Sequence, residues 1–227
     1  MKQYLIITLL ILAACTPQTV TKENVTAKAN LSITQVLDEF DALDAQYNTT
    51  WREEQIPKKI IRPEALQSWT SHVLALRNIT EKNTLAYELL EARLDMLSAQ
   101  TAIYLGVEVG EKGSVPLKKE GEEYLPGKLN CANAEDMAKT TRLYQMAFHN
   151  YLYFAHHMDK VLEKSVETRE RIGVNKERMP FYQSSFQDAV KKIEATAKAV
   201  KEQCGVTIKL APEPEMPAIP QHGVIAS

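Results

Sequence analysis

Along most of the chain after residue 31, apolar residues recur three or four positions apart, the spacing that places them on one face of a helix. Prolines and glycines separate these periodic stretches. The pattern predicts helices in the ranges 32–51, 63–79, 80–105, 133–164 and 176–204. We therefore expect an all-α fold, an antiparallel bundle of four to five helices, with the second and third helices separate or continuous.

Several residues mark the ends of the predicted helices. Ser32 and Gln35 form a capping box at the start of the first helix, and Pro63 suits the first position of the second. Thr80 is expected to cap the third helix, which should end by Gly106. These end signals support the predicted helices independently of the apolar spacing.

Other stretches lack the helical pattern. Residues 107–130 are rich in Gly, Glu and Lys and predict a long polar loop, with a short hairpin between Val107–Val115 and Tyr124–Leu125 as the alternative. After Gly205, which is placed to end the last helix, apolar and polar residues alternate, and we expect an extended strap along the bundle. The remaining residues, 211–227, are Pro-rich and predict an extended, unstructured tail.

The first fifteen residues carry a separate signal. Lys2 is followed by an apolar run, Tyr4–Leu12, which is too short to span a bilayer as a helix and indicates an export signal. Leu12-Ala13-Ala14-Cys15 then resembles the lipobox of prokaryotic lipoproteins. That resemblance implies cleavage before Cys15 and lipidation of its thiol. An ordinary signal peptide beside an incidental Cys15, or an uncleaved anchor, are the alternatives.

This start of the chain sets the expected domain organisation. The polar stretch that follows Cys15 has no apolar periodicity and predicts a tether with an end-to-end distance of roughly 20 Å. The expected order is signal peptide 1–14, lipidated cysteine and tether 15–30, helical domain 31–210 and tail 211–227. The domain would then lie outside the cytoplasmic membrane, at the cell surface or in the periplasm, and contact the membrane through its lipid.

The remaining two cysteines, Cys131 and Cys204, are predicted to form a disulfide. Lipidation of Cys15 leaves them as the only available pair, and an exported compartment permits the bond. Two separate buried thiols are the alternative. The pairing clamps the last two helices into a hairpin, which requires helices of similar length. We therefore predict a break near Ser165–Arg171, a stretch without an apolar face.

The composition and net charge bear on the kind of partner. The formal net charge of −2 is close to neutral and gives no support for a nucleic acid partner. The length suits one globular domain. The chain also contains four Asn-x-Ser/Thr sites, which indicate either a glycosylated surface, as in archaea or eukaryotes, or a chance cluster; they start at Asn24, Asn30, Asn48 and Asn78.

The candidate surface patch lies in the fourth predicted helix and consists of His149, Tyr153, His156 and His157. Three of these residues are four positions apart and should share a face nearly opposite the apolar stripe. His149 and His157 are two turns apart, about 12 Å, which is too far for shared ligation of one metal ion. We therefore favour a surface patch or second packing face over a metal site, and we expect no cofactor.

Two groups of carboxylates are further candidates for metal binding. Asp38, Asp41 and their acidic neighbours in the first helix indicate a solvated face rather than a cation site. Glu88 and Glu91 form a Glu-x-x-Glu pair, but a di-iron bundle needs Glu-x-x-His motifs on paired helices, and the chain has none. No catalytic residue is assigned from either group.

Together these patterns predict a membrane-anchored extracytoplasmic lipoprotein that acts as a non-catalytic binding, assembly or envelope-structural module. We expect a protein partner in the envelope, while nothing in the sequence sets the oligomeric state. The first alternative is a ligand-sensing or solute-binding accessory lipoprotein with a pocket between helices. The second is an envelope-directed hydrolase, although the sequence has neither a G-x-S-x-G nor a P-loop motif.

Overall fold

The computed structural model describes residues 31–47, 63–172 and 179–212, with the side chains of residues 172–187 left out. The expected signal peptide, Cys15, the tether, three of the Asn-x-Ser/Thr sites and nearly all of the Pro-rich tail lie outside these residues. Asn78, the fourth Asn-x-Ser/Thr site, is exposed near the end of its helix.

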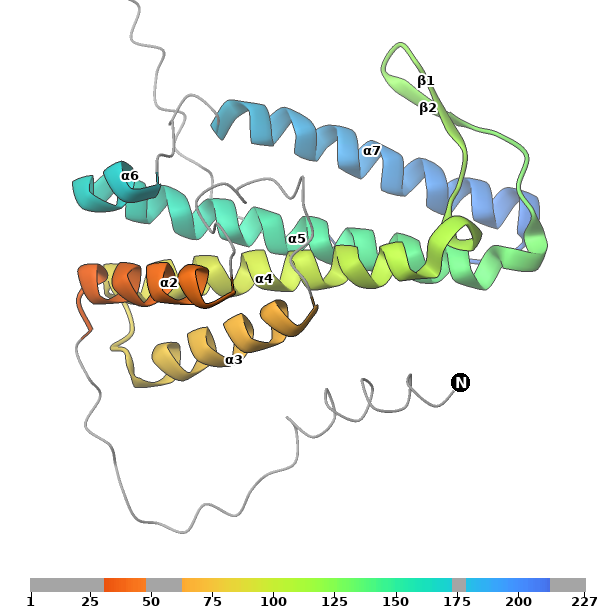
Figure 1. Cartoon of the computed structure of the whole chain (residues 1–227). Coiled ribbons are helices and arrows are strands. Elements are labelled where there is room, and N and C mark those ends of the chain that lie inside the picture. The colour runs from red at the N-terminus through yellow and green to blue at the C-terminus, as the bar shows by residue number, and fades with distance from the viewer. Residues whose placement is uncertain (1–30, 48–62, 173–178, 213–227) are drawn as a thin grey trace, which may run out of the picture.

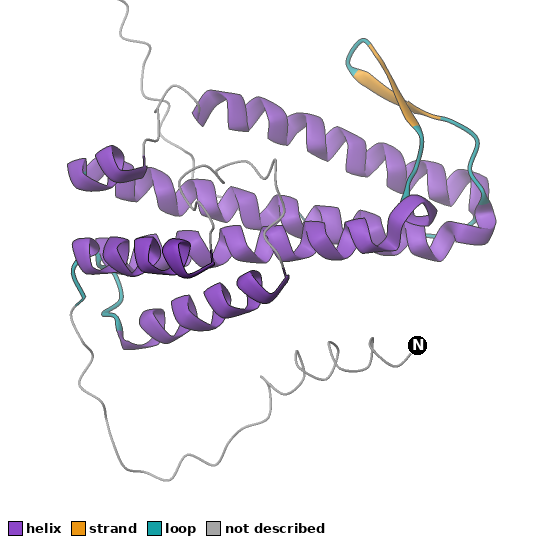
Figure 2. Ribbon diagram, in the orientation of Figure 1, coloured by secondary structure: helices purple, strands orange, loops and turns teal. Residues whose placement is uncertain are grey.

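Within the described ranges the protein is mostly helical, as the apolar spacing predicts, with one small sheet (Figure 2). The helices are α2 (Ile33–Tyr47), α3 (Pro63–Ile79), α4 (Leu85–Val109), α5 (Ala134–Lys164), α6 (Val166–Ile172) and α7 (Met179–Cys204). Short 3-10 helices are η1 (Gly110–Gly113) and η2 (Cys131–Asn133), and the strands β1 (Leu117–Glu120) and β2 (Glu123–Pro126) form a hairpin. None of these helices is both long and apolar enough to cross a membrane.

Helices α4 and α5 form the spine of the molecule, antiparallel and in contact along most of their length (Figure 1). Helices α2 and α3 pack against α4 near its start, while the last half of α7 packs against the start of α5. The β-hairpin projects beside the last turns of α7. The two ends of the spine are therefore covered by different elements.

The larger apolar cluster lies at the end where α4 begins and joins α2, α3, α4 and α5. The ring centroids of Phe40 and Trp69 are 5.6 Å apart at its centre. Arg93, only 4% exposed, places its guanidinium 4.3 Å from the centre of the Trp69 ring. This cation–π contact favours the charged group where water is excluded. Met158 and Leu162 extend the cluster to α5.

Small residues let the spine helices approach closely in its middle. Ala99 and Ala102 of α4 and Ala147 of α5 are buried against one another. Gly106 follows on α4, and a Cβ atom there would lie 3.0 Å from the Tyr144 ring. Helix α4 therefore does not end at Gly106 as predicted. It continues to Val109, because Gly106 leaves room for the Tyr144 ring of α5.

A second apolar cluster covers the other end of the spine. Met137 of α5 and Val200 of α7 are buried there with Leu129 and Ile208. Ile208 belongs to the predicted strap after Gly205, which has a positive φ of 70° where the helix ends. The packed strap continues to Ala211, the first residue of the predicted tail.

The predicted cap of the third helix is wrong. Thr80 does not cap α4; it is 1% exposed and its hydroxyl donates to the Leu76 carbonyl. Thr84 is the cap and accepts from the Tyr87 amide, after Asn83 has turned the chain with a φ of 65°.

The prediction of a polar loop over residues 107–130 is wrong in part, because this range contains a hairpin. Its strands are Leu117–Glu120 and Glu123–Pro126, so the first strand also differs from the Val107–Val115 segment of the alternative.

The break after α5 and the disulfide are both confirmed. Helix α5 ends at Lys164, and Ser165 adopts an extended conformation before α6 begins. The Ser165 hydroxyl accepts from the Thr168 amide at 3.1 Å and so caps α6. Cys131 and Cys204 are bonded, with Cα atoms 5.2 Å apart. The separate helix α6 lets α5 and α7 meet at the disulfide end.

Candidate functional site

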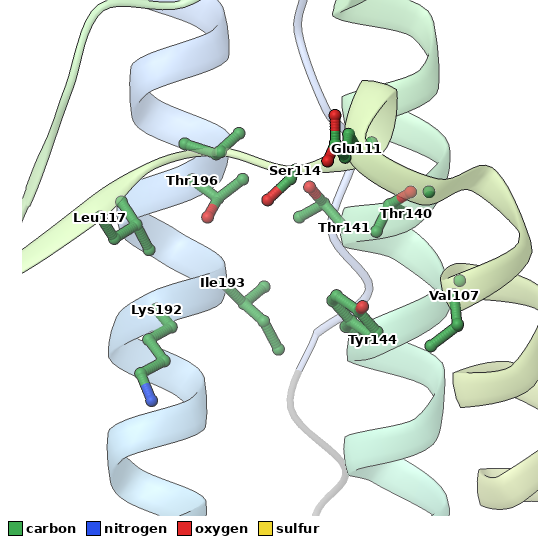
Figure 3. Close-up of a pocket in the computed structure, with 14 residues that line it drawn as sticks. Val107, Glu111, Ser114, Leu117, Thr140, Thr141, Tyr144, Lys192, Ile193 and Thr196 are labelled. Atoms are coloured by element: carbon green, nitrogen blue, oxygen red, sulfur yellow. The ribbon is translucent and has the colours of Figure 1, made fainter. Parts of the chain in front are cut away.

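A cavity of about 440 Å³ opens where the end of α4, η1, α5 and α7 meet (Figure 3). Its walls are mostly apolar, with Val115 from the segment after η1, Tyr144 from α5 and Ile193 from α7. The hydroxyl groups of Ser114 and Thr196 add polarity, and both side chains lie at the same end of the view in Figure 3. No histidine or cysteine is among the lining residues, so these hydroxyls have no imidazole base there.

The shape of this cavity depends on two close contacts of glycine. A Cβ atom on Gly113 would lie 2.0 Å from Thr140 Oγ1, so only glycine lets η1 rest on α5. The ring of Tyr144 likewise packs against Gly106 and forms one wall of the cavity. Thr140 is 4% exposed beneath η1. The loop after α4 is thus held on α5 by packing and leaves a hollow toward α7.

Lys192, the cationic residue of the cavity wall, already has a carboxylate partner. Its Nζ is 2.9 Å from Asp188 Oδ2 on the same helix. Asp188 also accepts from the Tyr124 hydroxyl and from Lys119 Nζ at 2.8 Å, which ties the β-hairpin to α7. Hydrogen bonds from Lys119, Tyr124 and Lys192 hold the pKa of Asp188 well below its ordinary value.

A second hollow, of about 570 Å³, lies between β2 and α7. Its lining mixes acidic and basic side chains, among them Glu122 and Lys191, whose Oε2 and Nζ are 3.2 Å apart. Glu122 is 92% exposed, so this pair lies in solvent. The hollow has the character of a solvated groove beside a projecting hairpin, whereas the first cavity has apolar walls.

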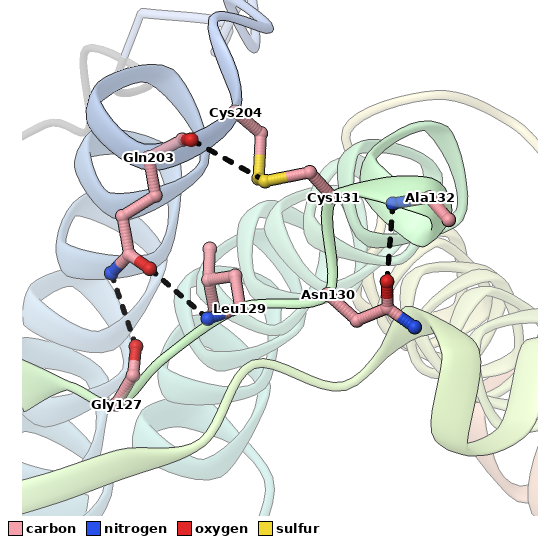
Figure 4. The surroundings of a disulfide bond; sticks show 7 residues. All are labelled: Gly127, Leu129, Asn130, Cys131, Ala132, Gln203 and Cys204. Carbon is pink, nitrogen blue, oxygen red and sulfur yellow. Dashed lines mark hydrogen bonds between the residues drawn. A yellow bond between two sulfur atoms is a disulfide. The ribbon is translucent and has the colours of Figure 1, made fainter.

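The disulfide end is reinforced by side-chain hydrogen bonds (Figure 4). Gln203, next to Cys204, accepts from the Leu129 amide at 3.0 Å and donates to the Gly127 carbonyl at 3.0 Å. Asn130 Oδ1 accepts from the Ala132 amide and caps η2. The segment between the hairpin and α5 is therefore held to α7 by a covalent bond and a bidentate side chain.

A half-buried charge cluster lies between α4 and α5. His157 Nδ1 is 2.6 Å from Glu88 Oε2, and Lys160 Nζ is 3.2 Å from the same oxygen. Burial raises the pKa of Glu88, but hydrogen bonds from His157 and Lys160 outweigh it and lower the pKa below its ordinary value. The ionised Glu88 can only accept, so His157 Nδ1 is the donor.

The same imidazole faces a second carboxylate. His157 Nε2 is 3.8 Å from Asp95 Oδ2, an oxygen that is buried without a hydrogen-bond partner. Burial, and then the negative charge of Glu91, raise the pKa of Asp95 to about 7. The cluster therefore contains one carboxylate that is ionised and one that changes its protonation near neutral pH.

The residues of the predicted patch are divided between two neighbouring surfaces. His157 does not face solvent opposite the apolar stripe; it lies against α4, because α5 is packed on more than one side. The ring centroid of His156 is 5.6 Å from that of His157, and burial lowers the pKa of His156. His149 instead lines a small hollow of about 200 Å³ near the strap, and Tyr153 is 40% exposed.

The acidic face of α2 contacts side chains from two other helices. Arg171 of α6 places its guanidinium nitrogens 2.9 Å from Asp38 Oδ1 and 2.6 Å from Asp41 Oδ2. Glu39 Oε2 is hydrogen-bonded to His72 Nε2 of α3 at 2.9 Å. These contacts join α2 to α6 and α3, so the acidic residues orient both helices on α2.

Sequence reasoning missed the cavity and the partners of Glu88. Both depend on which helix lies beside which, and the only sequence sign of the cavity was the density of glycines in residues 107–130. The described residues contain no group of three or more His, Cys, Asp or Glu side chains placed to hold a metal ion. Comparison with protein-family models, curated proteins and solved structures finds no match to this chain.

Proposed function

We propose that this protein is a membrane-anchored extracytoplasmic lipoprotein whose antiparallel helical bundle acts as a non-catalytic binding, assembly or envelope-structural module. One observation carries the proposal: Leu12-Ala13-Ala14-Cys15 directly follows the apolar run Tyr4–Leu12. A run of this length suits an export signal, and the cysteine that ends it offers a thiol for lipid attachment.

The disulfide supports the export part of this proposal. Cys131 and Cys204 are bonded, and such bonds persist in oxidising compartments outside the reducing cytosol. The bond also fastens the last helix, so oxidation contributes directly to the packing of the domain. A domain that depends on an oxidised cysteine pair fits an extracytoplasmic location.

The surface of α5 supports an interaction role. Met146 and Tyr153 are 46% and 40% exposed, and they are separated by two helical turns, which places them on one face. Large exposed apolar side chains that share a face are typical of protein contact surfaces, where tyrosine and methionine are enriched. We propose that an envelope protein contacts this face of α5.

Lipid anchoring is tested by mass spectrometry of the mature N-terminus. We expect a chain that starts at Cys15 and carries the mass of attached acyl groups, and we expect the protein to partition into the detergent phase. Cys15→Ser should abolish both properties without affecting the disulfide. An unmodified Cys15 in the mature wild-type protein would contradict the proposal.

The partner is tested by photocrosslinking from membranes. A photoreactive amino acid at Tyr153 is expected to give a discrete crosslinked band, whose protein is identified by mass spectrometry. The matched control places the same amino acid at Ser71, which is exposed on a different helix, α3. Equal labelling at both positions, or none at Tyr153, would argue against a contact at this face.

A second candidate function, ligand sensing or solute binding, is favoured by the cavity between η1, α5 and α7. Its volume of about 440 Å³ falls within the range of roughly 300–1,000 Å³ that is typical of small-molecule sites. Its mostly apolar walls with a few hydroxyl groups also match the usual make-up of such sites.

A further inference from the structure

We propose that the cavity between η1, α5 and α7 takes an uncharged amphiphilic small molecule. Its apolar body would lie against Val115, Tyr144 and Ile193, and its hydrogen-bonding group would meet the hydroxyls of Ser114 and Thr196. This inference rests on the ligand-binding function proposed above and assigns the chemical class of the ligand.

The apolar body is assigned from the walls. Ile193 is 9% exposed and faces the space that Tyr144 borders from α5 (Figure 3). Tyr144 itself is 42% exposed, although its ring rests on Gly106, so one of its surfaces remains open toward the cavity. Apolar ligand surface that covers these side chains leaves water, which contributes favourably to binding in proportion to the area removed.

The charged residues of the cavity wall indicate that the ligand is uncharged. Lys192 is paired with Asp188 at 2.9 Å, and in Figure 3 its Nζ points away from the hydroxyl side of the cavity. An anion would therefore have to compete with Asp188 for this ammonium group. Glu111, the lining carboxylate, is exposed, so a cation would gain little from it.

The polar group is assigned from the hydroxyls. Ser114 comes from the loop after η1 and Thr196 from α7, and both side chains line the cavity (Figure 3). A hydroxyl both donates and accepts. A pair of hydroxyls therefore suits a carbonyl, amide, amine or hydroxyl group of the ligand, whereas a purely apolar molecule would leave both groups without a partner.

The test uses a neutral apolar fluorophore, N-phenyl-1-naphthylamine, titrated into the purified oxidised domain. We expect enhanced fluorescence with saturable binding to the wild type. Thr196→Phe, which fills the cavity, should weaken binding at least about ten-fold. The matched control, Thr207→Phe, changes an exposed threonine on the strap and should leave binding unchanged. Circular dichroism checks that both variants fold.

Smaller substitutions keep the test valid if Thr196→Phe does not fold. Ser114→Ala and Thr196→Val are each expected to weaken binding about five-fold, the effect of losing one neutral hydrogen bond. The anionic probe 8-anilinonaphthalene-1-sulfonate should bind at least about ten-fold more weakly than the neutral one. Tighter binding of the anion, sensitive to Lys192→Met, would overturn the uncharged class.

The failure of this inference is distinct from failure of the proposed function. No saturable binding of the neutral probe, or equal binding by Thr196→Phe and wild type, would overturn the ligand site. Lipid at Cys15 and crosslinking at Tyr153 would be unaffected by that result, since both concern parts of the chain outside the cavity.

Discussion

Asp95 is the residue whose environment departs most from that of an ordinary surface carboxylate. It is 20% exposed, its Oδ2 atom has no hydrogen-bond partner, and its pKa is raised from the usual 3.8 to about 7 by burial and by Glu91. In the unfolded chain Asp95 ionises near its usual pKa, whereas in the folded protein it keeps its proton up to neutral pH. The stability of the fold should therefore fall as pH rises from about 4 to about 7.

Asp95→Asn removes this titration, because the amide is uncharged at every pH. We expect the variant to be more stable than wild type by about 2 kcal/mol at about pH 8, below the ceiling of roughly 4 kcal/mol that the two pKa values set. The gain should shrink as pH falls to about 4, the usual pKa of Asp95, and should approach zero only at lower pH, where Asp95 is protonated in both states. Urea unfolding at a series of pH values measures this difference.

Glu163→Gln is the control for Asp95→Asn, since Glu163 is exposed on α5 and its substitution should change stability little at any pH. A stability difference between Asp95→Asn and wild type that is the same at about pH 4 and pH 8 would contradict the assigned titration. A loss of stability in Asp95→Asn at about pH 8 would show that ionised Asp95 is favourably paired with His157.

The sequence identified some of the decisive residues but not their partners. The pairing of Cys131 with Cys204 was predicted by counting cysteines, because the expected lipidation of Cys15 would leave no other pair, and the disulfide is present. By contrast, Glu88 and His157 are 69 positions apart, and nothing in their local spacing shows that α4 and α5 lie side by side there. Contacts between distant helices need the fold before they can be named.

At the scale of elements, the packing of η1 against α5 depends on Gly113. Gly113→Ala would place a Cβ atom 2.0 Å from Thr140 Oγ1 and 2.9 Å from Val109 Cγ1, so η1 has to move off α5. We expect a loss of about 2 kcal/mol in the free energy of unfolding, the usual cost of overpacking. Thermal unfolding by circular dichroism measures it, and the cavity ligand should also bind more weakly.

The matching double variant separates a clash from other effects. Thr140→Ala removes the nearest atom, so Gly113→Ala combined with Thr140→Ala should recover part of the lost stability. The recovery is partial because Thr140 Cβ, which the alanine keeps, is 3.0 Å from the added atom. Additive losses in the double variant would show that the two residues do not interact as described.

Element boundaries were predictable where a local signal or a distance requirement set them. The break after Lys164 followed from the need for α5 and α7 to meet at the disulfide, and it is present at Ser165. The start of α4 was missed because Thr80 and Thr84 are both good capping residues, and tertiary packing decides between them by burying Thr80. The hairpin strands were missed because Lys119 and Tyr124 contact Asp188 of α7, a residue distant in the sequence.

The whole molecule has two apolar clusters at opposite ends of one helical spine. The first is built from α2, α3, the start of α4 and the end of α5. The second is built from the start of α5, the end of α7 and the strap, and it is smaller. The middle is held by alanines with little apolar area to bury. The disulfide lies at the end with the smaller cluster, so that end depends more on the covalent bond.

Reduction of the disulfide should therefore loosen the two ends unequally. The bond closes a loop with a sequence separation of 73, and in the chain-entropy description its loss costs about 4 kcal/mol. We expect hydrogen exchange of the Cys131→Ser, Cys204→Ser double variant to rise in residues 127–138 and 195–211. Exchange in α3 and the first half of α4 should change little. Cys15→Ser provides the comparison in which a cysteine is lost but the bond is kept. Uniform acceleration through both ends would mean that the spine couples them into one cooperative unit, and it would contradict a molecule stabilised by two separable clusters.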